Sequence, residues 1–299
     1  MNRLSFNRMF VPVLSFVFAM LVFVSCQKES SVTTPSVSEE EAATLSEESS
    51  GAEASFDDVS DIAFTAADEE GEAAGFGISG RTYQPLFEAL RLRIGNCATV
   101  SVFPNDSTYP KTVVIDFGDG CVGADGKTRK GKMVLHFTGP VRRPGSVVTL
   151  TFVNFYLNRA HVEGSVVFTN QSNLPQHKWS LAVLNGKVTF PSGRGYQYEG
   201  AKHVTQIAGM ATRMVRDDVY KIEGRSKTEF NNGKTINLNT ETPLIKKIAC
   251  NWISEGTLKI KINDRVLKLD YGFPGNGDCD NKALLSWNDG NSQRIIILP

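Results

Sequence analysis

From about residue 86 to the end of the chain, apolar and polar residues alternate in short runs that are typical of β-strands. In the run TLKIKIND, the apolar residues fall on one face, and Lys259 and Lys261 fall on the other. The runs GSVVTLTFVNFYLN, HVEGSVVFTN, WSLAVLNGKVTF and SQRIIIL are similarly rich in β-branched and aromatic residues. Asn-Gly and Asp-Gly pairs between such runs favour tight hairpins. The pattern predicts an all-β domain over residues 81–299, a large antiparallel meander that forms a sandwich or a strongly curved sheet.

The amino terminus has a different pattern. Arg3 and Arg8 are followed by the apolar run MFVPVLSFVFAMLVFV and then by Ser25 and Cys26, the layout of a secretory signal peptide over residues 1–25. The run has 16 residues and contains Pro12, so it is short for a membrane-spanning helix. An uncleaved amino-terminal anchor is the alternative interpretation.

The end of this run resembles the lipobox of bacterial lipoproteins. Val24 and Ser25 precede Cys26 as in that motif, although Phe23 stands where Leu is usual. The resemblance implies that Cys26 is diacylated and becomes the mature amino terminus, and several acyl chains anchor a protein stably. The following QKES resembles the export signal of surface lipoproteins of Bacteroidota. We therefore expect a lipid-anchored outer-membrane protein, surface-exposed rather than periplasmic; a soluble secreted protein is the alternative.

Charge divides the rest of the chain. Residues 29–80 hold 14 Asp and Glu and no Lys or Arg, whereas residues 81–299 hold 29 Lys and Arg against 18 Asp and Glu. A segment with one sign of charge and few large apolar residues has too little to bury. Residues 26–80 are therefore expected to be a disordered, flexible acidic tether.

One part of this tether has helical spacing. Phe56, Val59, Ile62 and Ala63 would share one face of a helix over residues 55–67. A short amphipathic helix that docks on the β domain is the expectation there, since so short a helix would be marginal alone.

Two stretches of the β domain share one sequence motif. Each begins with Cys, continues with a strand, a turn and a second strand that ends in Asp-[Phe/Tyr]-Gly, and closes with a turn and another Cys. They span residues 97–121 and 250–279 and contain all the cysteines besides the lipobox one. Four cysteines allow three pairings, and the repeat favours Cys97–Cys121 with Cys250–Cys279. Disulfides persist in exported proteins. A Cys₄ metal site, the alternative, lacks the close C-x-x-C pairs usual for zinc.

Acidic residues gather in the turns of both repeats. Their carboxylates could bind calcium, the one cofactor considered. The alternative is that they are structural, because Asp residues in turns commonly form hydrogen bonds only with their own backbone. No other metal is predicted. The candidate cation ligands are Asp116, Asp119 and Asp125 in the first repeat and Asp270, Asp278 and Asp280 in the second.

Basic residues cluster between the two repeats and attract anions. An envelope glycan or another polyanion is the expected partner, and no specific nucleic-acid partner is predicted. The nearest polyanion is the acidic segment of the same chain, held at high effective concentration. Alternatively, these charges only keep the sheet soluble. The candidate polyanion ligands are Lys127, Arg129, Lys130, Lys132, Arg142 and Arg143.

Catalytic motifs are missing from the sequence. The four histidines are scattered, and neither H-E-x-x-H nor G-x-S-x-G occurs. His161 and Glu163 fall on one face of a predicted strand, where an exposed polar face is the simpler interpretation of the pair. Trp179, Trp252 and Trp287 would form either a sugar-stacking platform or part of the core. We expect no catalytic residues, and hence no enzyme.

Taken together, the lipobox, the acidic segment and the runs CATVSV, KTVVIDFGDGC, GKMVLHFTG and GDCDNKA resemble a family of all-β envelope lipoproteins of Bacteroidota. The resemblance implies an anchored, non-enzymatic structural or binding module. Alternatives are a glycan- or polyanion-binding accessory lipoprotein and a glycan hydrolase. The tripeptide at residues 106–108 also resembles a periplasmic O-glycosylation signal, with Ser107 as the acceptor.

Overall fold

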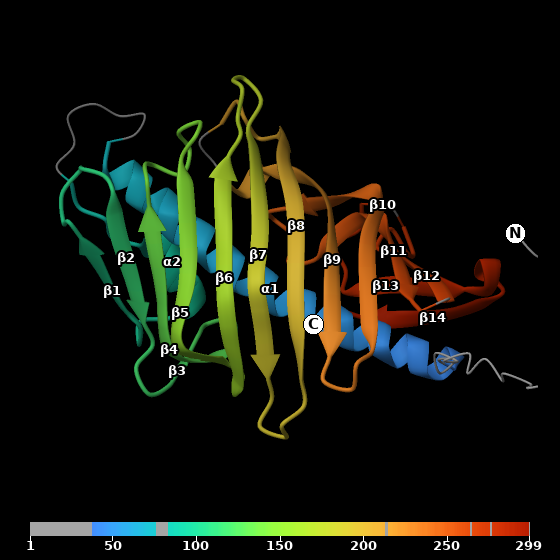
Figure 1. The fold of residues 1–299 in the computed structure, drawn as a ribbon. Helices are drawn as coiled ribbons and strands as arrows, with labels where there is room; N and C mark the ends of the chain where they lie inside the picture. The colour runs from blue at the N-terminus through green and yellow to red at the C-terminus, as the bar shows by residue number, and fades with distance from the viewer. Residues whose placement is uncertain (1–37, 76–82, 213–214, 264, 276, 299) are drawn as a thin grey trace, which may run out of the picture. The chain divides into compact units, whose positions relative to one another are not determined.

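The strands form one continuous antiparallel sheet that curls round a long helix (Figure 1). The computed structural model describes residues 38–75, 83–212, 215–263, 265–275 and 277–298. These residues all belong to one unit that spans residues 35–299. The all-β prediction is confirmed, and of the two expected forms the curved sheet is the one observed.

The sheet has fourteen strands, and its order follows the chain, except that the short strand β3 follows β2 along the same edge of β4 and pairs with β4. The strands are β1 (Thr99–Phe103), β2 (Lys111–Asp116), β3 (Cys121–Val122), β4 (Thr128–Phe137), β5 (Val147–Leu157), β6 (Ala160–Asn170), β7 (Lys178–Thr189), β8 (Gly195–Ala208), β9 (Val219–Phe230), β10 (Thr235–Lys247), β11 (Ile253–Ile262), β12 (Arg265–Asp270), β13 (Lys282–Trp287) and β14 (Ser292–Ile297).

The helices are α1 (Glu39–Ala73) and α2 (Glu88–Ile94), with single 3₁₀ turns at Val215–Asp217 and Asn288–Gly290. Helix α1 begins where the Ser38 side chain accepts a hydrogen bond from the backbone N–H of Glu41, at 3.2 Å. It crosses the concave face of the sheet and forms the hydrophobic core with the inward strand residues. Besides Asp58 and Glu70, its buried side chains recur every three or four residues and are mostly small: Ala42, Leu45, Ser46, Ser49, Ala52, Phe56, Val59, Ser60, Ile62, Ala63, Ala66 and Ala67.

The predicted flexible tether is therefore wrong for residues 39–73. The helix expected over residues 55–67 lies inside α1, but α1 is 35 residues long. Small Ala and Ser side chains let the helix approach the strands closely, so this face is buried although few of its residues are large and apolar. The signal peptide, Cys26 and residues 27–37 lie outside the described residues.

Strand β11 shows the predicted alternation. Leu258, Ile260 and Ile262 are buried against the core, while Lys259 and Lys261 are exposed on the opposite, outward face. Among the described residues, no helix is both long enough and apolar enough to cross a membrane.

The curl of the sheet is built with β-bulges that face glycines. The β4–β5 register shifts near Gly131, and the β6–β7 register shifts near Gly164. Each glycine has a positive φ, and a Cβ on it would lie 2.0 Å from the backbone oxygen of Asn154 or 2.6 Å from that of Asn185, respectively. Only glycine fits at such positions, and the bulges bend and twist the strands.

Candidate functional site: the concave face and its acidic helix

The concave face of the sheet supplies the cations that neutralise helix α1. The helix lies in the segment without Lys or Arg, and basic side chains from the strands, their connections and α2 point at its carboxylates. These basic residues are Arg93, Lys111, Lys127, Arg129, Arg142, Lys202 and Lys234. Folding therefore pairs the acidic segment with the basic domain that follows it.

Asp58, in the middle of α1, lies among three cations. Its carboxylate is 2.8 Å from Arg129 Nη2, 3.0 Å from Lys127 Nζ and 3.1 Å from Arg93 Nη2. Arg129 also contacts Asp125 at 2.6 Å. Burial alone would raise the pKa of Asp58, but the charges and hydrogen bonds of Arg129 and Lys127 hold it below its usual value. Asp58 is therefore ionised at neutral pH although it is buried.

Near the carboxyl end of α1, Glu70 and Lys111 form a fully buried ion pair. Glu70 Oε1 and Lys111 Nζ are 2.6 Å apart, and neither side chain is exposed. The hydroxyls of Tyr83 and Tyr109 donate to the same carboxylate, and the Lys111 ammonium lies 4.1 Å and 4.8 Å from the centres of their rings. Burial and the Glu70 charge raise the pKa of both tyrosines, so they remain protonated donors.

Two neighbouring carboxylates fix the end of α1 to other elements. Glu69 accepts the backbone N–H groups of Ala89, at 2.8 Å, and Leu90, at 3.0 Å, at the start of α2. Burial raises the pKa of Glu69 in spite of these two hydrogen bonds. Asp68 pairs with Arg142 in the β4–β5 connection. The helix is therefore joined to α2 as well as to the sheet.

In the amino-terminal half of α1, Lys202 of β8 pairs with two carboxylates at once. Its Nζ lies 2.7 Å from both Glu53 and Asp57. Burial would lower the pKa of Lys202, but these two acids raise it well above its usual value. Beside the pair, Phe56 stacks on Tyr198 of β8 with ring centres 4.9 Å apart. Charge pairing and aromatic packing thus hold the same turn of the helix.

The six residues predicted as a polyanion site run from the start of β4 to the β4–β5 connection. They are Lys127, Arg129, Lys130, Lys132, Arg142 and Arg143. Three of them pair with α1 carboxylates, as described above. Lys132 pairs with Asp116 at 2.6 Å, and Lys130 lies 3.9 Å from Asp119. An external polyanion would therefore have to compete with carboxylates of the same chain for most of these cations.

The candidate calcium ligands mostly have other partners. Asp116 and Asp270 each accept the backbone N–H of the glycine two residues later, at 2.9 Å. Asp125 pairs with Arg129, while Asp280 accepts a backbone N–H at 2.7 Å. Asp119 is exposed, and the backbone N–H of Asp278 donates to the carbonyl of Gly275 at 3.2 Å. Within the described ranges, no three His, Cys, Asp or Glu side chains converge on a possible metal position.

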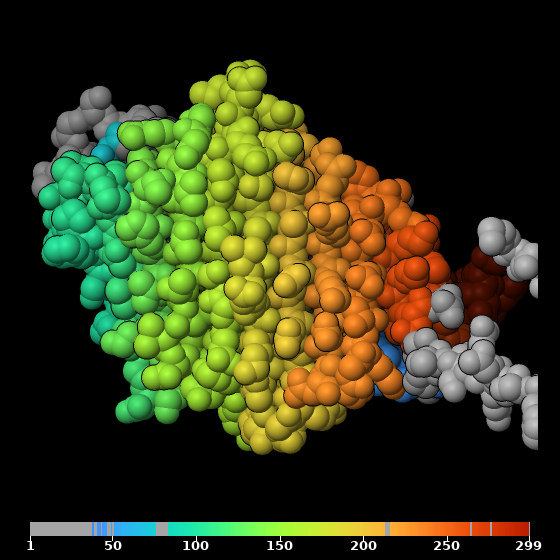
Figure 2. Space-filling model, viewed as in Figure 1, coloured from blue at the N-terminus to red at the C-terminus, as the bar shows by residue number. Residues whose placement is uncertain are grey.

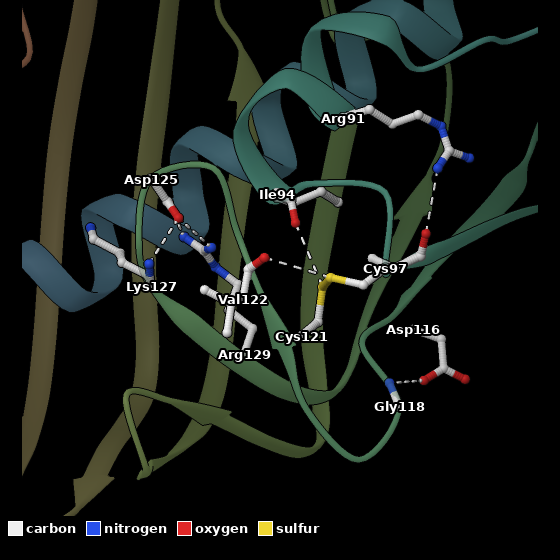
Figure 3. Close-up of a disulfide and its surroundings, with 11 residues drawn as sticks. Arg91, Ile94, Cys97, Asp116, Gly118, Cys121, Val122, Asp125, Lys127 and Arg129 are labelled. Atoms are coloured by element: carbon white, nitrogen blue, oxygen red, sulfur yellow. Dashed lines mark hydrogen bonds and ion pairs between the residues drawn. A yellow bond between two sulfur atoms is a disulfide. The ribbon is translucent and has the colours of Figure 1, made fainter.

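The two predicted cysteine pairs are confirmed. Cys97 and Cys121 are bonded, as are Cys250 and Cys279, with a Cα–Cα distance of 5.6 Å in each pair. Figure 3 shows the first disulfide beside α2, where a Cys121 Sγ contact reaches the carbonyl of Ile94. The first pair brackets the β1–β2 hairpin and the second brackets β11 and β12. Each copy of the repeated motif thus forms a hairpin closed by a disulfide, one toward each end of the sheet.

His161 and Glu163 lie side by side on β6. His161 Nδ1 is 3.6 Å from Glu163 Oε2, which also pairs with Lys187 at 3.1 Å, and the histidine ring stacks on Tyr156. The side chains of His161, Glu163 and Lys187 are all partly exposed. The pair therefore belongs to a surface network of the β5–β7 strands.

The three tryptophans do not share a platform. Trp179 of β7 is buried, and its Nε1 approaches the carbonyl of Val141 at 3.5 Å. Trp287 of β13 packs against the core six strands further along the sheet, and Trp252 precedes β11. Trp179 and Trp287 therefore agree with the alternative interpretation, in which the tryptophans contribute to the core.

Ser107 is exposed in the loop between β1 and β2. The preceding Asp106 accepts the backbone N–H of Thr108 at 2.8 Å, which forms a local turn around the serine. The lipidation candidate Cys26 is outside the described residues.

Sequence reasoning missed the helical extent of α1 and a group of exposed cations on the outward face. Arg225, Lys227, Lys259, Lys261 and Lys268 are exposed on β9, β11 and β12. The alternation in TLKIKIND places Lys259 and Lys261 outward, but which residues lie opposite them on neighbouring strands is known only from the strand register.

One small hollow opens where β10 bulges, between α1 and β8–β11. Its empty volume, open solvent included, is about 250 Å³, less than a usual small-molecule site. It is lined by Glu53, Lys202, Ile222, Gly224, Arg225, Ser226, Leu238, Thr240, Leu244 and Leu258.

Comparisons with protein families, with curated proteins and with solved structures found nothing that matches this chain.

Proposed function

We propose that this chain is an envelope lipoprotein, anchored to the outer membrane through acyl groups on Cys26, whose β domain is a non-enzymatic structural or binding module. The layout of residues 1–26 and the resemblance to all-β envelope lipoproteins of Bacteroidota support the anchor. The export signal after Cys26 supports exposure at the cell surface.

The occupied concave face is the observation that carries the proposed role of the domain. A concave sheet surface is where a ligand or a substrate would ordinarily be enclosed. Here helix α1 lies along it, with Asp58 and Glu70 in buried ion pairs. A partner would therefore meet the outward face and the loops, which suits surface recognition.

A glycan- or polyanion-binding role is the second candidate. The exposed cations of β9, β11 and β12 support it, because they lie together on one face of the sheet. They are different residues from those that the sequence suggested.

The anchor is tested by intact mass spectrometry on protein extracted from envelopes, before and after reduction and alkylation. The proposal predicts a lipid-sized increment on Cys26 and four cysteines that alkylate only after reduction. A C26S variant, as the matched control, should lose the increment and leave the membrane fraction when the membranes are washed in high salt. An unmodified Cys26 in the membrane-extracted protein would overturn the anchor.

A further inference from the structure

The outward face of the sheet carries a group of cations that we call the outward basic patch, Arg225, Lys227, Lys259, Lys261 and Lys268. Their strands are neighbours through β10, and all five side chains are exposed. Figure 2 shows the outward face of the sheet from β1 toward this end. The strand register aligns them in two rows, Arg225–Asn239–Lys259–Lys268 and Lys227–Asn237–Lys261.

The patch places like charges directly opposite one another. Lys259 of β11 faces Lys268 of β12 across the strand pair, an arrangement that destabilises a sheet. Of the described carboxylates, none forms an ion pair with Arg225, Lys259, Lys261 or Lys268, and only Lys227 has one, with Glu229 at 3.2 Å. Elsewhere on this face, by contrast, lysines are paired with acids, as Lys187 is with Glu163.

Protection of a sheet edge does not explain these lysines. Charged residues on an edge strand prevent it from pairing with other chains. Strands β9, β11 and β12 have a bonded neighbour on both sides, so none of them is an edge. The patch is bordered by acids: Glu199 faces Lys227 across the β8–β9 pair, Glu229 pairs with Lys227, and Asp270 comes two residues after Lys268.

The patch lies at the end of the strands where α1 begins. Glu41, in the first turn of α1, pairs with Lys234 in the hairpin between β9 and β10. Asn237, in the middle of the second row, comes three residues after Lys234. Eleven residues separate Cys26 from Ser38, and a chain of that length spans at most roughly 40 Å. Acyl groups on Cys26 would therefore keep this end of the domain close to the membrane.

We propose that the outward basic patch docks the domain on the anionic lipid headgroups of the membrane that holds its anchor. This inference rests on the proposed function for the anchor, and charge complementarity carries the rest. Lysines near a negatively charged leaflet each contribute attraction that fades within a Debye length, about 8 Å at physiological salt. The two rows contain no aromatic residue, whereas single-stranded nucleic acids and sugars are usually bound by stacking on aromatic rings.

The test uses the whole mature chain made without acyl groups by the C26S substitution. Its binding to phosphatidylglycerol–phosphatidylcholine vesicles, compared with phosphatidylcholine vesicles alone, is measured by co-sedimentation at low and high salt. We expect binding only to the anionic vesicles, and loss of that binding in high salt. K259Q/K261Q/K268Q should lower the partition coefficient on the order of 100-fold, since each lysine contributes roughly fivefold.

The matched control is R159Q/K178Q/K187Q, which removes the same charge from exposed or partly exposed positions on β7 and in the β5–β6 turn. It should bind within a few-fold of the parent, and circular dichroism should show both triple variants folded. Equal losses in the two triple variants would overturn the inference, because net charge alone would then explain binding. Binding of heparin or duplex DNA without binding of anionic vesicles would also overturn it.

The two proposals fail separately. A lipid increment on Cys26 together with no vesicle binding by the C26S chain would leave the anchor standing and remove the docking patch. Patch-dependent vesicle binding with an unmodified Cys26 would do the reverse.

Discussion

The inward and outward faces of the sheet both carry lysines, but the two sets have opposite environments. Lys111 is fully buried and paired with Glu70, 2.6 Å away. Lys268 is exposed, faces another lysine and has no carboxylate partner among the described residues. Inward cations hold the chain's own acidic helix in place, whereas outward cations keep their charge available to something else.

The difference between the two faces shows how an acidic segment with few large apolar residues can become part of a core. Removing charges from water is costly, and the cost is offset only when partners and hydrogen bonds are in place. Arg129 and Lys127 supply that compensation for Asp58, and Lys111 supplies it for Glu70. Both sets of lysines add to the same net charge, so composition alone does not tell them apart.

Removing an inward cation should have the largest effect. K111M leaves the buried Glu70 carboxylate without its cation, and we expect the free energy of unfolding to fall by about 3–5 kcal/mol. Urea denaturation measures this loss. The double variant K111M/E70L replaces the pair with apolar groups and should recover most of the stability. If K111M cost no more than a surface substitution, the claimed role of the pair would be wrong.

Opening a disulfide should cost slightly less. The chain-entropy account gives roughly 3.5 kcal/mol for each of the closed loops, with sequence separations of 24 and 29. We therefore expect C97S/C121S and C250S/C279S to be similarly destabilised, although the first disulfide lies beside α2 and the second brackets β11 and β12, two strands of the patch. A much larger loss in the first pair would show that it also fixes the helices.

Acid should weaken the inward contacts selectively. The pKa of Asp58 is lowered in the folded state, so the unfolded chain binds its proton more readily. The stabilisation from Asp58 is therefore complete above the unfolded pKa, about 3.9, and is lost as the pH falls through the lower folded value.

D58N removes this titration and should make the acid limb of the stability curve shallower. At neutral pH it should cost about 1.5–3 kcal/mol, as for other hydrogen bonds to charged groups. Urea midpoints of both proteins over a pH series should converge in acid. Parallel curves would mean that Asp58 does not contribute to the pH dependence.

The smallest effect should come from the outward face and have the opposite sign. K268Q removes one member of the facing lysine pair, so we expect the free energy of unfolding to rise by about 0.2–0.5 kcal/mol at low salt. The gain should shrink in high salt, where the repulsion is screened. A clear destabilisation by K268Q would mean that this lysine has a structural partner.

Much of the β domain could be predicted from the sequence because its signals are local. The alternation around Ile260 and the turn pairs predicted strands, and the repeated motif predicted the pairing of Cys97 with Cys121. The turn that both repeats share is also determined by local contacts, since Asp116 and Asp270 each accept a hydrogen bond from the backbone N–H two residues later.

Helix α1 could not be predicted in full because what stabilises it is distant in sequence. Its buried face includes Ser49 and Ala63, which carry little hydrophobic signal. Asp58 and Arg129 are 71 residues apart in the chain, so the sequence shows two charges without showing that they meet. The outward patch was missed for a related reason, since Lys259 and Lys268 are brought together by strand register.

Native-state hydrogen exchange over residues 39–73, followed by mass spectrometry at neutral pH, tests the central claim most directly. If buried ion pairs and close packing hold α1 in the sheet, its amides should be protected to a degree similar to those of β6 and β7, and K111M should reduce that protection near Glu70. Exchange of residues 39–73 at the rate of an unstructured chain, while the strands stay protected, would contradict the account.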